Sequence, residues 1–316
     1  MDYRLNVTYI TFGGHVEVHK YRYLYFVIMF TVYILIISSN FTIVCIIMIH
    51  KNLHEPMYIF IAALLINSVL FSTAIYPKLL IDFLSDEQII SYTACLLQWF
   101  SYYWLGGSDF ILLSIMAYDR YVSICNPLKY TTIMQNTIVK IFLFSAWILP
   151  ACQVSVVILL SVKKEICKFH LKGILCNSTV QTLHCVRSTI LNLYGLVVLV
   201  TSVLFPVLFI LFTYSRILLV SYRCRGVRRR AAQTCLPHLL VIINFSCLIA
   251  YDVILPRLEL DSPKIVRLIM ALQVLIYHPL FNPIIYGLKM RKIYYHLKRL
   301  FCRFQTLTSS VVSSHG

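Results

Sequence analysis

The sequence contains stretches with almost no charge that are long enough to cross a lipid bilayer. Residues 23–49 carry no charged side chain, and residues 92–117 carry only Asp109. A bilayer core requires roughly 20 consecutive, mainly apolar residues in a helix. Backbone groups inside lipid must find hydrogen-bond partners within their own segment, so stretches of this length are restricted to helices. The sequence therefore predicts a helical membrane protein.

Seven such stretches follow one another, separated by short charged segments. They are predicted at about residues 23–49, 57–77, 92–117, 138–160, 190–220, 231–255 and 265–286. Residues 1–22 form a polar and aromatic extracellular segment, in which Asn6 begins a glycosylation sequon. Residues 287–316 form a basic amphipathic helix on the inner leaflet and a cytoplasmic tail. The predicted fold class is an all-α membrane protein, a seven-transmembrane helix bundle with a short amphipathic eighth helix.

Composition and charge set the orientation of this bundle. The 316 residues are 59% hydrophobic and 13% charged, with a mean hydropathy of +0.79, which is too apolar for an ordinary soluble domain. In a soluble protein, a net charge of +16 would suggest nucleic-acid binding. Here the basic residues lie in short segments between apolar runs, which does not fit a nucleic-acid-binding domain. With the N-terminus outside, 16 Lys and Arg residues and two acidic residues lie on the inner side. The outer side then has 12 Lys and Arg residues and nine acidic residues. The positive-inside rule favours that orientation, with the tail in the cytoplasm.

A motif of fifteen residues closes the third predicted span. Residues 116–130 read MAYDRYVSICNPLKY, with PMY at 56–58 before them and NPIIY at 282–286 after them. Together these motifs resemble the odorant receptors, a branch of the rhodopsin-like G-protein-coupled receptors, from about residue 24 to residue 300. The resemblance implies a multi-pass protein in the plasma membrane of an olfactory sensory neuron. It would bind a small extracellular odorant and activate a heterotrimeric G protein of the stimulatory olfactory type, which raises cAMP.

The resemblance also implies a set of residues for G-protein coupling at the inner helix ends. In the family, the residue at Arg120 bonds the acid at Asp119 at rest and meets the G protein in the active state. The implied set is Asp119, Arg120, Tyr121, Tyr214, Asn282, Pro283 and Tyr286. Pro237 and Ser246 depart from the family pattern of the sixth span. Without the resemblance, Arg120 would be read as a basic anchor at the interface.

Four cysteines lie on the predicted outer side, which faces an oxidising compartment. They are Cys95, Cys167, Cys176 and Cys185, and their spacing alone leaves three pairings open. The resemblance implies a Cys95–Cys176 bridge and a Cys167–Cys185 bridge. The nearby His170 and His184 are predicted to be solvated loop residues and not metal ligands.

Asp109 is the one acid in the middle of a predicted span, eleven residues before Arg120 and nearly on the same helical face. Odorant receptors usually carry an acid here and a second one in the second span, where a rhodopsin-like sodium site is centred. Ser68 stands at that second place, beside Asn67. The alternatives are a sodium ion held by Asp109, Ser68, Asn67 and Asn282, a protonated Asp109, or a neutral acid hydrogen-bonded to those groups. No other cofactor is predicted.

The resemblance places the ligand pocket among the outer halves of spans three, five, six and seven. Tyr102 stands where amine receptors carry an aspartate, and Ile276 stands where opsins carry the retinal lysine, so neither of those families fits. Each predicted lining residue could instead serve helix packing. The predicted residues are Tyr102, Tyr103, Gly106, Val198, Ser202, Ile249, Ala250, Val253, Leu272 and Leu275.

Two other functions are alternatives to an odorant receptor. A rhodopsin-like receptor for an internal hormone or lipid would be expressed outside sensory neurons. A membrane transporter would show repeated halves and interrupted mid-membrane helices, and the sequence displays neither. No enzyme is predicted, because the helix ends carry no constellation of nucleophile, base and metal ligands. The predicted partners are a small-molecule odorant, a heterotrimeric G protein and membrane lipid, without nucleic acid.

Overall fold

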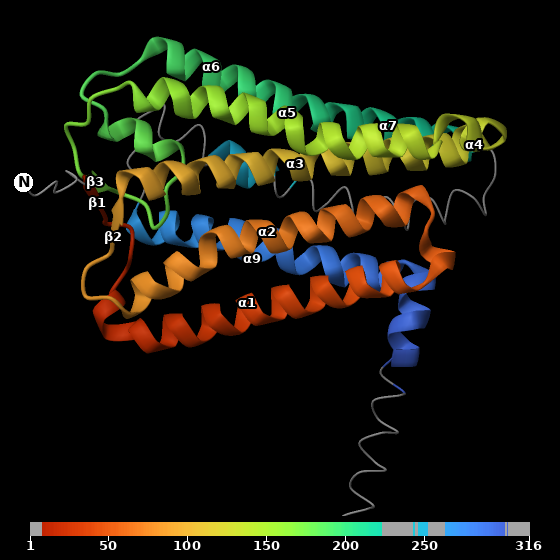
Figure 1. The fold of residues 1–316 in the computed structure, drawn as a ribbon, viewed down its shortest axis with the longest axis horizontal. Coiled ribbons are helices and arrows are strands. Elements are labelled where there is room, and N and C mark those ends of the chain that lie inside the picture. The colour runs from red at the N-terminus through yellow and green to blue at the C-terminus, as the bar shows by residue number, and fades with distance from the viewer. Residues whose placement is uncertain (1–7, 223–242, 244–245, 252–262, 301, 303–316) are drawn as a thin grey trace, which may run out of the picture.

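The computed structural model describes residues 8–222, 243, 246–251, 263–300 and 302. Most of these residues are helical, and the long helices run side by side with a small sheet at one end of the bundle (Figure 1). We call the end with the sheet and residues 163–188 the loop end. The opposite end, where α3 finishes, is called the Arg120 end.

The long helices follow one another in the predicted order. They are α1 (Val18–Ile49), α2 (Pro56–Leu84), α3 (Tyr92–Cys125), α5 (Asn136–Val162) and α9 (Lys264–Lys289). The fifth predicted span consists of α6 (Thr189–Leu199), a π-helical turn (Val200–Leu204) and α7 (Phe205–Tyr222). Short elements connect them: α4 (Tyr130–Ile133) and 3-10 turns at Lys51–Leu53, Pro127–Lys129 and Ser178–Leu183. Beyond α9, residues 291–300 form a further helix that points away from the bundle (Figure 1).

Five of these segments are long and apolar enough to cross a membrane: α1, α2, α5, the α6–α7 segment and α9. Helix α3 is 34 residues long but more polar, because Gln98, Ser108 and Asp109 interrupt its apolar run. It contacts α2, α5 and α7, which places it inside the bundle (Figure 1). The sixth predicted span, 231–255, lies mostly outside the described residues, and within it residues 246–251 are helical.

The outer surface of the helices is apolar, as contact with lipid requires. Phe41 on α1, Phe144 on α5 and Phe212 on α7 are each more than 60% exposed. A soluble protein rarely leaves a broad apolar surface uncovered. These side chains therefore form the surface that would face the acyl chains.

Several helices extend beyond the predicted spans. Helix α2 continues through Pro77 to Leu84, whereas the sequence placed the end of that span at Pro77. A proline is tolerated within a membrane helix because neighbouring groups satisfy the backbone carbonyl that it frees. The extension buries Asp82, which forms an ion pair with Lys78 one helical turn earlier. The buried acid is thus paired within the last turns of the helix.

A three-stranded sheet covers the loop end of the bundle. Strand β1 (Tyr9–Phe12) pairs antiparallel with β2 (Ile89–Ser91) and parallel with β3 (His170–Leu171). Ile10 and Phe12 alternate inward and pack in one apolar cluster with Trp99. The N-terminal segment is therefore fastened onto the connecting loops.

Two disulfides hold residues 163–188 against the bundle. Cys95 in the first turn of α3 is bonded to Cys176, and Cys167 is bonded to Cys185 within the loop. Both pairs are those that the resemblance implies. The prediction of a solvated His184 was wrong, because the folded loop leaves its side chain only 7% exposed. Burial, with a smaller contribution from Lys164, lowers the pKa of His184.

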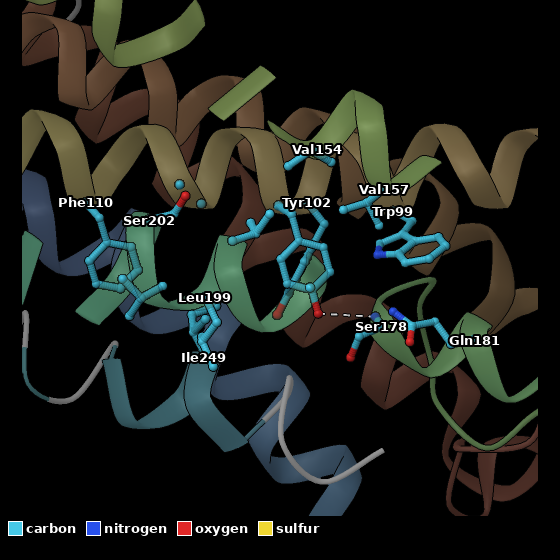
Figure 2. A pocket seen from close by; sticks show the side chains of 16 residues that line it. Trp99, Tyr102, Phe110, Val154, Val157, Ser178, Gln181, Leu199, Ser202 and Ile249 are labelled. Carbon is cyan, nitrogen blue, oxygen red and sulfur yellow. Dashed lines mark hydrogen bonds between the residues drawn. The ribbon is translucent and has the colours of Figure 1, made fainter. Parts of the chain in front are cut away.

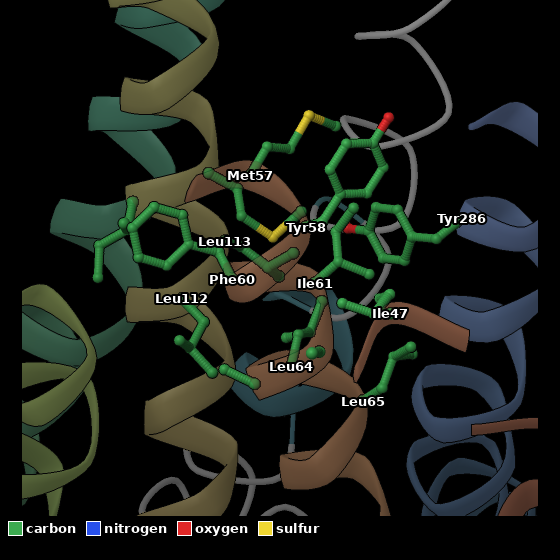
Figure 3. Packing of buried hydrophobic residues seen from close by; sticks show 14 of the residues in the cluster. Ile47, Met57, Tyr58, Phe60, Ile61, Leu64, Leu65, Leu112, Leu113 and Tyr286 are labelled. Carbon is green, nitrogen blue, oxygen red and sulfur yellow. The ribbon is translucent and has the colours of Figure 1, made fainter. Parts of the chain in front are cut away.

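Apolar packing at the Arg120 end joins α1, α2, α3, α7 and α9 in a single cluster. Phe60 and Ile61 on α2 lie at its centre and are fully buried. Tyr286 on α9 packs into the same cluster near Tyr58 (Figure 3). This packing fixes the helix ends around Arg120 to one another.

We expect Cys95→Ala and Cys176→Ala each to abolish surface expression, and the double variant to be no worse than either single variant. Loss of a native disulfide commonly costs about 2–5 kcal/mol, and the two halves of one bridge cannot contribute separately. Surface biotinylation measures the outcome, with Cys152→Ala as the control because that cysteine is free and exposed. Additive losses, or normal surface levels of either single variant, would contradict the role of this bridge.

Candidate functional site

A hollow of about 680 Å³, counting the space open to the outside, lies between α3, α5 and the α6–α7 segment toward the loop end. Four of its lining residues, Trp99, Tyr102, Gly106 and Phe110, recur at intervals of three or four along α3 and so share one helical face. Figure 2 shows the rings of Trp99, Tyr102 and Phe110 around the hollow, with Val154 of α5 on the same wall. The walls are therefore mainly aromatic and aliphatic.

Few polar groups border the hollow. The Tyr103 hydroxyl accepts a hydrogen bond from the backbone N–H of Ser178, at 3.2 Å, which ties α3 to the loop. The Ser202 hydroxyl donates to Gln153 Oε1 at 2.5 Å. None of the described residues that line the hollow carries a charged side chain. A bound charge would find no counter-ion among them.

The π-helical turn at Val200–Leu204 brings the α6–α7 segment close to α3. A Cβ added at Gly107 would lie 3.0 Å from Pro150 Cβ and 3.9 Å from Ser202 Cβ, so a hydrogen atom at this position permits the packing of three helices. A Cβ added at the adjacent Gly106 would meet no atom within 4 Å. The two glycines thus have different roles. Gly107 allows close contact with Pro150 and Ser202, whereas Gly106 leaves space in the hollow.

Six of the ten predicted ligand residues line this hollow: Tyr102, Tyr103, Gly106, Val198, Ser202 and Ile249. Ala250, Leu272 and Leu275 do not. Leu275 is fully buried in an apolar cluster, and its carbonyl accepts a hydrogen bond from the Tyr76 hydroxyl at 3.3 Å. Leu272 packs against the same cluster, so this face of α9 serves helix packing. Val253 lies outside the described residues.

Sequence reasoning missed part of the lining. Trp99 and Phe110 could have been found from the helical spacing around Tyr102 and Gly106. The contributions of α5, such as Val154, and of the loop, such as Gln181, depend on tertiary contacts that no spacing reveals.

The Arg120 end holds an ion pair within α3. Arg120 donates to Asp119 Oδ2 from Nη2 at 2.7 Å and from Nε at 3.1 Å. The Tyr130 hydroxyl donates to the other oxygen, Oδ1, at 2.9 Å. Asp119 is fully buried. A carboxylate in such a site of low dielectric is stable only with hydrogen-bond donors or a positive charge beside it, and Arg120 and Tyr130 supply them. Burial, followed by the charge of Asp119, raises the pKa of Tyr130.

The remaining predicted coupling residues lie in or against the apolar cluster of the Arg120 end, or within α9. Tyr214 and Tyr286 are buried in the apolar cluster of the Arg120 end, and Tyr121 packs against it. Asn282 and Pro283 lie within α9 and are buried. The arrangement places two tyrosines on different helices near the end of α3.

A polar cluster lies between the hollow and the Arg120 end. The four residues that the sequence grouped there, Asp109, Asn67, Ser68 and Asn282, are brought together. Asn67 Nδ2 donates to Asp109 Oδ1 at 2.9 Å, and Asn282 Nδ2 donates to Ser68 Oγ at 3.2 Å. A fifth member, His278 of α9, places Nδ1 3.2 Å from Asp109 Oδ2. Sequence reasoning missed His278, although an ionisable residue inside a membrane span is itself a signal of a functional site.

Comparisons with known proteins agree with the motifs. The family model for the olfactory receptor matches residues 29–304. The chain belongs to the olfactory receptor family. It is 29% identical to human olfactory receptor 11A1 over 306 residues, which cover 96% of each chain, and 31% identical to human olfactory receptor 2AG2 over 89% of each. Mouse olfactory receptor 4B13 is 30% identical over 90% of this chain and 93% of its own length.

Membership in the olfactory receptor family settles the fold class and the broad type of protein. Members are multi-pass, seven-helix receptors of the G-protein-coupled class and are not enzymes. The predictions of fold class, family and non-enzymatic function are therefore confirmed. Within this fold, the hollow and the ion pair occupy opposite ends of the same helix, α3.

We expect Gly106→Leu in this olfactory receptor family member to raise the half-maximal agonist concentration at least about tenfold, at a normal surface level. Its Cβ would meet no atom within 4 Å, so the larger side chain would take up space in the hollow, and tenfold corresponds to about 1.4 kcal/mol of binding free energy. The measurement is a cAMP concentration–response curve with an agonist found by ligand screening.

Two glycine variants serve as controls for this prediction. Gly106→Ala should retain the response, because its Cβ meets nothing. Gly107→Leu should instead lower surface expression, because it would collide with Pro150. An unchanged response of Gly106→Leu would show that the agonist binds elsewhere.

Proposed function

We propose that this olfactory receptor family member binds a neutral, mainly apolar odorant in the hollow between α3, α5 and the α6–α7 segment, and so activates a heterotrimeric G protein. The G protein would be of the stimulatory olfactory type, which raises cAMP. The observation that carries the proposal is the hollow itself, which has mainly aromatic and aliphatic walls and no charged residue among those described. Ligand pockets in proteins are mostly apolar, with a few polar groups that orient the ligand.

The chemistry of the lining narrows the class of odorant. Trp99, Tyr102 and Phe110 offer aromatic surfaces, while Val154 and Leu199 offer aliphatic ones. The hydroxyl groups near the hollow suit a single ester, ketone, aldehyde or alcohol group. A free amine or carboxylate would be desolvated without a partner, which costs several kcal/mol. The expected odorant is thus a compact hydrocarbon body with one neutral polar group.

The proposed orientation places the loop end outside the cell and the Arg120 end in the cytoplasm. Three features support it: the excess of Lys and Arg on the Arg120 side, the two disulfides at the loop end, and the sequon at Asn6. The proposed location is the plasma membrane of olfactory sensory neurons. The basic helix at residues 291–300 would lie against anionic lipid of the inner leaflet.

Arg120 is the proposed contact for the G protein. Its side chain is 27% exposed and bonded to Asp119 in the same helix, an arrangement that suits the resting state. Opening of the bundle would let Arg120 exchange Asp119 for a new partner, while Tyr130 keeps one oxygen of the buried carboxylate satisfied. Tyr214 and Tyr286, which pack in the apolar cluster of the same end, would approach Arg120 in the active state.

We expect neutral volatile compounds with one polar group to raise cAMP in cells that express the receptor, and amines and carboxylic acids of equal size to remain inactive. The measurement is a cAMP response to a panel matched for size and differing in charge, at verified surface expression. A response confined to charged compounds would contradict the proposed pocket.

The same assay tests the role of Arg120. Arg120→Ala should lose at least about 90% of the agonist-driven response while reaching the surface, because the charged contact is removed. Lys129→Ala is the matched control, since Lys129 is an exposed basic residue at the same end. Equal losses in both variants would mean that general positive charge, and not Arg120, supports coupling.

A further inference from the structure

The carboxylate of Asp109 is fully engaged by side chains of two other helices. Oδ1 accepts from Asn67 of α2 at 2.9 Å, and Oδ2 lies 3.2 Å from Nδ1 of His278 of α9. The Asp109 and His278 side chains are 3% and 2% exposed. At this depth in the bundle, a carboxylate is stable only with donors or a positive charge beside it. The imidazole supplies such a neighbour at the second oxygen.

The side-chain oxygens of Asn67 and Ser68 already take part in hydrogen bonds. Asn67 Oδ1 accepts from the Trp147 indole N–H at 2.9 Å, while its amide nitrogen faces Asp109. Ser68 Oγ donates to the Leu64 carbonyl at 3.1 Å and accepts from Asn282 Nδ2. A hard cation requires several oxygen ligands. Here Asp109 and Ser68 are contacted by two amide nitrogens and an imidazole, which are not ligands of that kind.

We propose that His278 takes the place of the cation beside Asp109, so that this receptor is held in its resting state by a contact between α3 and α9 and does not bind sodium there. Each oxygen of Asp109 already has a nitrogen neighbour, from Asn67 at Oδ1 and from His278 at Oδ2. Sodium could enter at Oδ2 only by displacing the imidazole. The sodium site that family resemblance suggests therefore does not fit these residues.

The pair is well placed to couple the hollow to the Arg120 end. Asp109 directly precedes Phe110, which lines the hollow, and His278 lies one helical turn before Asn282, whose Nδ2 is 3.3 Å from His278 Nδ1. Asn282 is in turn one turn before Tyr286 in the apolar cluster of the Arg120 end. Movement of α9 relative to α3 would separate His278 from Asp109. His278 is thus a positioning residue for activation, a role that rests on the proposed function.

Thermal unfolding of the purified full-length receptor tests the absence of a sodium site without any signalling readout. Tryptophan fluorescence in lipid nanodiscs would be followed in sodium chloride and in choline chloride at equal ionic strength. The wild-type Tm should differ by less than about 1 °C. The variant Ser68→Asp with His278→Thr, which adds a carboxylate and removes the imidazole, should gain about 2 °C or more in sodium. Ser72→Ala, equally buried in α2, should behave as wild type.

Two outcomes of the unfolding experiment would overturn the proposal. A sodium-dependent rise in the wild-type Tm would show that a cation binds despite His278. A variant that remains indifferent to sodium would show that His278 is not what replaces the ion.

Basal nucleotide exchange on the co-expressed G protein tests the restraining role of the pair. Asp109→Asn and His278→Asn should each raise basal exchange about threefold or more, and the double variant should equal the larger single effect, since a pair is broken only once. The exchanged variant, Asp109→His with His278→Asp, should return toward the wild-type rate. Additive effects would overturn the pairing. If no form of the receptor, wild type included, activates the G protein, the proposed function fails while the unfolding result still decides the sodium question.

Discussion

Helix α3 makes polar contacts with three other helices within the region that lipid surrounds, and the arrangement of the bundle depends on those contacts. Asp109 accepts from Asn67 of α2 and contacts His278 of α9, and the Trp104 indole donates to the Trp147 carbonyl of α5 at 2.9 Å. Apolar packing against lipid tails gives little preference for one helix arrangement over another. The polar contacts therefore specify which faces of the helices meet. The hollow and the ion pair take their positions from this shared helix.

The two ends of α3 are constrained in different ways. At the loop end, Cys95 is covalently bonded to Cys176, and the Gln98 side chain accepts from the Cys176 backbone N–H at 2.8 Å. At the Arg120 end, the described contacts are non-covalent: the hydrogen bonds and ion pair of Asp119, and the apolar cluster around Tyr286. Non-covalent contacts can be exchanged for others, whereas the disulfide cannot. A ligand favours one of two bundle states when it makes better contacts in that state than in the other.

The sequence predicted those features that follow from local composition or from family motifs. Apolar runs located α1, α2, α5, α6–α7 and α9, and the motif around Arg120 anticipated its bond to Asp119. Features set by contacts between distant residues were not predictable: the π-helical turn beside Ser202, the strand pairing of residues 9–12, and the approach of His278 to Asp109. Leu275 was assigned to the pocket because it lies in the outer half of the seventh predicted span. The rotation of α9 about its axis instead places its side chain in the apolar core.

A structure of the receptor bound to an agonist and to its G protein, determined by cryo-electron microscopy, would show both the ligand and the coupling contact. We expect ligand density beside Tyr102, Gly106 and Phe110. We also expect that the Arg120 guanidinium will have left Asp119 for a new contact at the G-protein interface. Density at another place in the bundle, or an intact Arg120–Asp119 bond in the active complex, would contradict the proposed function.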